Sequence, residues 1–104
     1  MTHIMKIDEM SQTMFYVWNI SKATEEWEVL EFVESSEDIA YGQKTYRTPD
    51  AAYRAGLREL KTYKEGIFML EVHSENIDKY PRNDSINYES GYMALSVNGK
   101  IQEA

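Results

Sequence analysis

The sequence predicts an α+β fold in which one main helix, over about residues 49–64, packs on an antiparallel sheet of four to five strands. Three observations predict this class. Aromatic and β-branched residues are concentrated over residues 13–20, a proline-initiated amphipathic segment follows in mid-chain, and Asn98-Gly99 separates two strand-like segments near the end. The order of strands, one helix and further strands is typical of a helix packed on one antiparallel sheet.

The length of 104 residues predicts a single domain over residues 1–104, with residues 1–12 forming a loose arm or a short edge strand. The absence of cysteine excludes disulfide scaffolds and thiolate metal sites, and favours a reducing compartment, most simply the cytoplasm. The N-terminus has no continuous apolar core, so we expect no secretory signal. The longest apolar runs are far below the ~20 residues that span a bilayer, so we expect no membrane association.

Residues 13–20 predict the first strand, in which alternate side chains share a face. One face would carry Met14, Tyr16, Trp18 and Ile20, and the other face Phe15 and Val17. Because both faces are apolar, we expect this strand to be central in the sheet or covered on both sides.

The segment 25–34 has two interpretations. A strand would place Trp27 on the face opposite Glu26 and Glu28. A helix capped by Thr24 would instead align Trp27 with Leu30. We favour the strand, because the aromatic and β-branched residues in this segment prefer an extended backbone. A turn and a third strand, over residues 41–47, would follow.

The sequence Thr48-Pro49-Asp50 predicts the start of the main helix, because threonine caps, proline suits the first position and an acid faces the positive end. Gly66 suits a left-handed cap beyond its far end. A glycine inside a helix costs about 1 kcal/mol relative to alanine, so Gly56 indicates a close approach to the sheet or simple tolerance. The expected apolar stripe contains Ala52, Tyr53, Gly56, Leu57, Leu60 and Tyr63.

Residues 67–73 predict another strand, with a second helix through residue 80 as the alternative. The polar residues 74–88, which include Pro81, indicate a long loop. Residues 92–97 and 100–102 predict a hairpin joined by Asn98-Gly99, the preferred pair for a type I′ turn.

The formal net charge is −7, from 18 acidic and 11 basic residues, which argues against a whole-surface nucleic-acid binder. The charges are segregated, because residues 44–64 carry six basic and only two acidic residues between two acidic flanks. Arg54, Arg58 and Lys61 share one helix face, and Arg47 lies just upstream. These four residues are candidates for contact with nucleic acid or another anion; the alternative, which we favour, is a solvated face that meets acids of neighbouring strands.

Seven acids lie within residues 25–38. In a strand, Glu26, Glu28 and Glu34 would share a face, and such a carboxylate row could imitate a phosphate backbone or dock on a basic protein. The alternative is a solubilising surface that protects a sheet edge. No pattern indicates a buried carboxylate pair of the kind that acid–base catalysis requires.

Eight tyrosines and two tryptophans are more than a small core requires, and both types are favoured at interfaces. They indicate a protein-contact surface or a homodimer; the alternative is a set of half-buried side chains at the rim of the core. The candidate protein contacts are Glu26, Glu28, Glu31, Glu34, Tyr41, Tyr88 and Tyr92.

The sequence contains no catalytic motif, and we expect no catalytic residue, cofactor or metal site. Of the two histidines, His3 lies in the N-terminal arm and His73 ends a strand. Our leading hypothesis is a non-enzymatic protein-interaction module, an accessory or inhibitor protein of a bacterium or its mobile elements, whose partner is another protein. Nucleic-acid binding is the second hypothesis. A small enzyme is the third, and it would need a pocket around Glu71, His73 and Tyr80.

Overall fold

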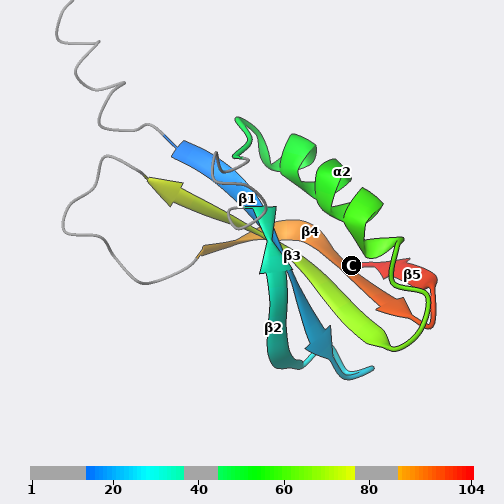
Figure 1. Cartoon of the computed structure of the whole chain (residues 1–104). Helices are drawn as coiled ribbons and strands as arrows, with labels where there is room; N and C mark the ends of the chain where they lie inside the picture. The colour runs from blue at the N-terminus through cyan, green and yellow to red at the C-terminus, as the bar shows by residue number, and fades with distance from the viewer. Residues whose placement is uncertain (1–13, 37–44, 77–86) are drawn as a thin grey trace, which may run out of the picture.

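The computed structural model describes residues 14–36, 45–76 and 87–104. Its elements are β1 (Met14–Ala23), β2 (Val29–Ser35), α2 (Pro49–Leu60), β3 (Ile67–Asn76), β4 (Asn87–Val97) and β5 (Lys100–Glu103). All strands join one antiparallel sheet in the order β2-β1-β3-β4-β5, and α2 packs across one face of it against β1, β3 and β4 (Figure 1). The predicted α+β class is confirmed.

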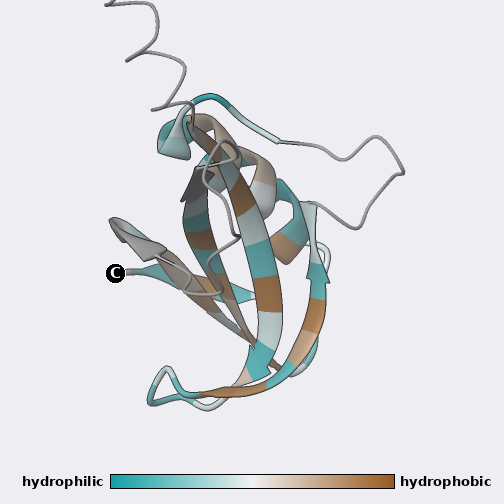
Figure 2. Cartoon of the chain, turned by 90° about the vertical axis from the view of Figure 1, so that its left-hand side faces the viewer, coloured by the Kyte–Doolittle hydropathy of each residue, from teal (hydrophilic) through white to brown (hydrophobic). Residues whose placement is uncertain are grey.

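Strand β1 lies inside the sheet between β2 and β3, as its two apolar faces predicted. Trp18 and Ile20 are buried beneath α2, and Val17 is buried on the opposite face. Figure 2 shows the resulting alternation of hydrophobic and hydrophilic bands along the strands. Of the third strand expected over residues 41–47, residues 41–44 lie outside the described residues, and Tyr46 forms a single bridge to Tyr16.

The strand interpretation of the segment after β1 is confirmed for Val29–Ser35, but not for Trp27 and Glu28. These two residues lie in the turn, where Trp27 has a left-handed backbone with φ 64°. The Thr24 hydroxyl causes the reversal by accepting hydrogen bonds from the backbone N–H groups of Glu26 (3.1 Å) and Glu28 (3.2 Å). Thr24 therefore organises a hairpin turn and caps no helix.

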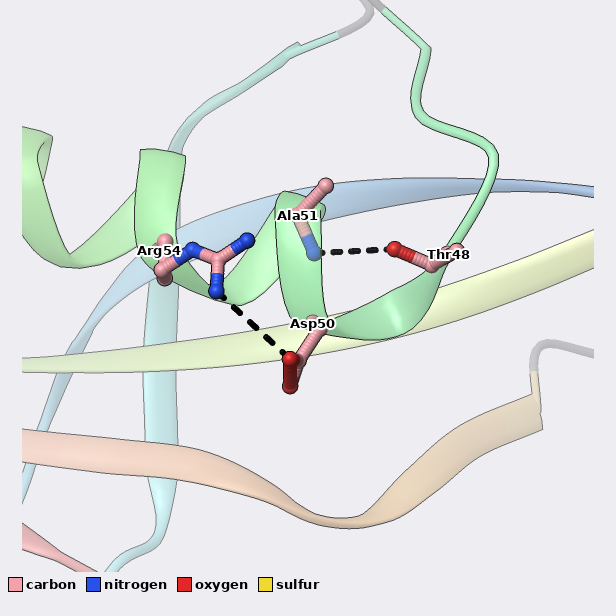
Figure 3. A network of polar contacts seen from close by, with 4 residues as sticks. All are labelled: Thr48, Asp50, Ala51 and Arg54. Carbon is pink, nitrogen blue, oxygen red and sulfur yellow. Dashed lines mark hydrogen bonds and ion pairs between the residues drawn. The ribbon is translucent and has the colours of Figure 1, made fainter.

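Helix α2 begins where the sequence predicted. Thr48 is the N-cap, its hydroxyl accepts from the N–H of Ala51 at 3.1 Å, and Asp50 lies in the first turn (Figure 3). The helix ends at Leu60 rather than at residue 64. The Glu59 carbonyl accepts both the N–H (3.0 Å) and the hydroxyl (2.7 Å) of Thr62, and these short-range bonds close the last turn.

Gly66 does not cap the helix, although the sequence suggested that role. Its backbone is left-handed, with φ 100°, and it joins the start of β3 to the β4–β5 turn. The Gly66 N–H donates to Asn98 Oδ1 and the Asn98 N–H donates to the Gly66 carbonyl, both at 2.8 Å. Asn98 and Gly99 both have positive φ, so the predicted type I′ turn is confirmed.

The predicted strand after α2 extends to Asn76, and residues 77–86 lie outside the described part.

Two apolar clusters lie on the two faces of the sheet, and even-numbered residues of β3 contribute to the main core beneath α2. The buried members of that core are Trp18, Ile20, Ala52, Ala55, Leu60, Leu70, Val72 and Ala94. A smaller cluster lies on the second face, meaning the sheet face opposite α2. Its buried members are Ala23, Met69 and Leu95, and Trp27, Ile67, Met93 and Val97 pack against them half-buried.

Gly56 marks the closest approach of α2 to the sheet. A Cβ atom at this position would collide with Leu70 Cδ1 and lie 2.9 Å from Trp18 Cβ. Of the two explanations offered by the sequence, close approach is therefore the correct one. Small residues on the underside of α2, including Ala52 and Ala55, let the helix backbone lie against the large side chains of β1 and β3.

We predict that Gly56→Ala lowers the free energy of unfolding by about 1–3 kcal/mol, because overpacking outweighs the gain in helix propensity. Urea denaturation measures this change. Arg58→Ala, at an exposed position of the same helix, is the control and should stay within about 0.5 kcal/mol of the wild type. A Gly56→Ala variant as stable as the wild type would contradict the packing described.

Candidate protein-interaction surface

Three large apolar side chains are exposed on the edge strand β2. Val29, Leu30 and Phe32 retain 49%, 66% and 51% of their accessible surface, and we name them the β2 patch. Val29 pairs with Ala23 and Phe32 pairs with Ser21, so both lie on the second face of the sheet. Phe32 and Val29 therefore lie on the same face as the smaller apolar cluster, at the edge of the sheet.

Acidic side chains lie close to the β2 patch along the chain. Glu25, Glu26, Glu28 and Glu31 are all exposed on the β1–β2 hairpin, and we name them the acidic rim. Across residues 14–36 the only basic side chain is Lys22, whose Nζ lies 3.8 Å from Glu31 Oε1. Both partners are more than half exposed, so water screens this pair and the surface remains strongly negative.

The carboxylate row expected along one strand face does not form. Glu26 lies in the turn that Thr24 organises, ahead of β2. The β1–β2 register shifts between Ile20 and Ser21, which inserts Val33 as an extra residue and places Glu34 opposite Ile20, on the helix side of the sheet. A bulge cannot be recognised from an alternating pattern alone, so this division of the glutamates was not predictable from the sequence.

Glu34 belongs instead to a polar cluster beneath the end of α2. The Tyr63 hydroxyl donates to Glu34 Oε2 at 3.2 Å. A hydrogen bond to Glu34, together with burial and the repulsion between the two carboxylates, raises the pKa of Glu59 to about 7. Burial and the charge of Glu34 raise the pKa of Tyr63 to about 12. Glu59 and Glu34 therefore form a carboxylate pair in which Glu59 is readily protonated, and no sequence pattern indicated this pair.

The tyrosine candidates have different surroundings. Tyr92 is half-buried, and its ring lies edge-to-face with that of Tyr53, with centroids 5.6 Å apart, so it belongs to the rim of the core. Tyr88 lies in β4 opposite His73. Tyr41 lies outside the described residues. The eight tyrosines thus include core-rim members as well as the interface candidates that the sequence suggested.

The basic helix face is only partly neutralised. Arg54 Nη1 lies 3.6 Å from Asp50 Oδ2, one turn earlier on the same helix, and both side chains are largely exposed (Figure 3). Arg47, Arg58 and Lys61 are exposed and form no ion pair among the described residues. The expectation that strand carboxylates would meet this face is therefore wrong for the described part of the sheet.

Two titratable residues of β3 are buried on the second face. Glu71 is 8% exposed and His73 is 3% exposed. Burial raises the pKa of Glu71 and lowers the pKa of His73 to about 4, so His73 is uncharged at neutral pH. His73 was predicted to end a strand, but β3 continues beyond it to Asn76. Tyr80, the third residue of the enzyme hypothesis, lies outside the described residues.

No protein-family model matches the chain, and no curated protein or solved structure shows detectable similarity to it. In residues 14–36, 45–76 and 87–104, no three histidine, aspartate or glutamate side chains gather closely enough to hold a metal ion. The helix in that part of the chain is too short and too polar to cross a membrane.

We predict that the Glu34–Glu59 pair destabilises the fold as pH rises. The folded-state pKa of Glu59, about 7, lies above the ordinary value of 4.5, so the folded protein holds a proton that the unfolded chain releases. The stabilisation is complete below about pH 4.5 and is lost as pH rises through about 7. Glu59→Gln, which cannot ionise, should therefore exceed the wild type by about 1 kcal/mol at about pH 8 and equal it near pH 4.

Urea denaturation at both pH values measures this difference. Glu71 and His73 are present in both proteins, so their own contributions cancel. Glu65→Gln removes an exposed glutamate and is the matched control. A constant difference between wild type and Glu59→Gln across this pH range would show that the pKa of Glu59 is not raised in the folded protein.

Proposed function

We propose that this protein is a non-enzymatic interaction module that binds another protein through the β2 patch and the acidic rim. The observation that carries the proposal is the exposure of Val29, Leu30 and Phe32 on one strand. Water is a poor environment for such side chains, and an apolar surface bordered by polar residues is typical of a protein contact. Phe32 is the expected anchor, because aromatic side chains contribute most strongly at interfaces.

The two edges of the sheet differ in a way that supports this assignment. Strand β5 has four residues, begins with Lys100 and exposes no large apolar side chain. Short length and charge protect such an edge from unwanted contacts. Strand β2 has seven residues and exposes three apolar side chains. The unprotected edge is therefore the one on which we propose that the partner binds.

An accessory or inhibitor protein of a bacterium or its mobile elements remains our proposal for the biological setting, and the cysteine-free composition supports the cytoplasm as its compartment. Such a protein would act by covering a surface of its partner, which requires an exposed contact region and no catalytic group.

A second function, nucleic-acid or anion binding, is supported by the exposure of Arg58 and Lys61 without an ion pair in the described residues. Together with Arg47 and Arg54 they offer phosphate contacts along one side of α2. The negative charge of the whole chain opposes this function, because it repels a polyanion at long range.

We predict that the double variant Leu30→Ser/Phe32→Ser loses protein partners that the wild type retains in affinity capture followed by mass spectrometry. Gln102→Ser, at an exposed position of the opposite edge strand, is the matched control and should retain them. Both substituted positions are exposed, so the fold should persist, and circular dichroism checks this. Identical capture by all three proteins would contradict the proposed surface.

The second function predicts a different result. Fluorescence anisotropy with single-stranded RNA and duplex DNA should show binding that weakens steeply as salt rises from about 50 mM to about 200 mM. Arg54→Ala/Arg58→Ala/Lys61→Ala should weaken that binding at least about tenfold, since charge-assisted phosphate contacts are lost. Lys100→Ala is the control. An absence of binding at about 50 mM salt would eliminate this function.

A further inference from the structure

We propose that the partner segment that occupies the β2 patch is a positively charged polypeptide, with large apolar side chains placed between lysine or arginine residues. This inference rests on the proposed function and adds the chemistry of the partner. It follows from the shape of the hairpin, from its charges and from the irregular pairing of β2.

The apolar residues of the proposed contact lie beside the smaller apolar cluster of the second face. Phe32 and Val29 lie on the second face next to Ser21 and Ala23, and Ala23 belongs to the same cluster as Met69. Trp27 packs half-buried against that cluster from the turn. A partner side chain that covers Phe32 and Val29 would therefore extend an existing apolar cluster rather than cover an isolated residue.

The negative charge of the β1–β2 hairpin favours a positively charged partner. Four exposed glutamates lie on the hairpin, and Lys22 is its only cation. A lysine or arginine side chain that approached this edge of the sheet would come near Glu28, which precedes Val29, and Glu31, which lies between Leu30 and Phe32 in β2. An acidic or neutral segment would bury the apolar residues and partly desolvate these carboxylates without offering them a cationic partner, which costs free energy.

The same charges argue against a second copy of this chain as the occupant. Two hairpins packed through their β2 patches would bring two acidic rims together, and each chain carries a net charge of −7. Like charges placed opposite each other across an interface oppose association. The surface is thus unsuited to self-association and suited to a basic partner.

The pairing of β2 indicates how the partner would bind. The register with β1 shifts twice, between Ile20 and Ser21 and again between Lys22 and Ala23. Such bulges twist an edge strand and interrupt the regular row of backbone groups that an added strand requires. We therefore assign the contact to the side chains of Val29, Leu30 and Phe32, and not to extension of the sheet by backbone hydrogen bonds.

Selection from a random peptide library tests this inference without choosing the partner in advance. The full-length chain is immobilised and exposed to a phage-displayed library of random peptides, with Leu30→Ser/Phe32→Ser as the counter-selection protein. We expect enriched peptides that carry a net positive charge and at least two large apolar residues. Their synthetic versions should bind about five- to tenfold more weakly in about 500 mM salt than in about 50 mM salt.

Charge variants separate the inference from the proposed function. Glu28→Gln/Glu31→Gln should weaken binding of the selected peptides about five- to tenfold, since two charge pairs are lost. Glu103→Gln neutralises a glutamate on the opposite edge strand, keeps an acceptor for the Tyr53 hydroxyl, and should leave binding unchanged.

Each outcome decides a different claim. Enriched peptides that require Phe32 and Leu30 but carry no positive charge would overturn the basic partner and leave the interaction module intact. Peptides that bind the double serine variant equally well would overturn both. A wild-type dimer in light scattering that Phe32→Ser dissociates would identify a second copy as the occupant and also overturn this inference.

Discussion

The close contact of α2 with β1 and β3 at Gly56 determines how the helix covers the sheet. It positions α2 over the middle of the sheet, with Trp18 and Leu70 beneath it. A helix is about 10 Å in diameter and strands lie about 4.8 Å apart, so one helix covers roughly two to three strands. Five strands are too many for it, and an edge strand must extend beyond its cover.

The two ends of the edge strand β2 have different surroundings. Its two register shifts direct Glu34 toward α2, where it meets Glu59 and Tyr63, and leave Phe32 on the second face. One end of the strand is thus tied to the helix by polar contacts, and the other end displays apolar side chains. The exposed apolar surface of β2 therefore arises from the same irregular pairing that connects the strand to the core.

The features predicted correctly from the sequence are those that a few adjacent residues determine. Thr48-Pro49-Asp50 supplies its own cap, Asn98-Gly99 supplies its own turn, and the two apolar faces of β1 predicted an inner strand. These signals depend on local backbone chemistry, so one sequence is enough to recognise them. The α+β class followed from their order along the chain.

The features that were missed depend on contacts between distant residues. The position of Glu34 depends on a bulge that pairing with β1 creates, and its meeting with Glu59 depends on where α2 ends. The turn at Trp27 depends on the Thr24 hydroxyl, which the helix alternative had assigned to a cap. The acidic residues of the rim were noticed in the sequence as a run of charge. The exposed β2 patch was not predicted, because the sequence does not reveal whether an apolar side chain is exposed.

Apolar side chains of β2 face solvent, while those beneath α2 do not. Paramagnetic relaxation by a neutral gadolinium chelate, measured by NMR on the 104-residue chain, detects this difference. We expect strong relaxation of the Leu30 methyl and Phe32 ring protons and little effect on the methyl groups of Ile20 and Leu70. Equal protection of Leu30, Phe32 and Leu70 would contradict this expectation.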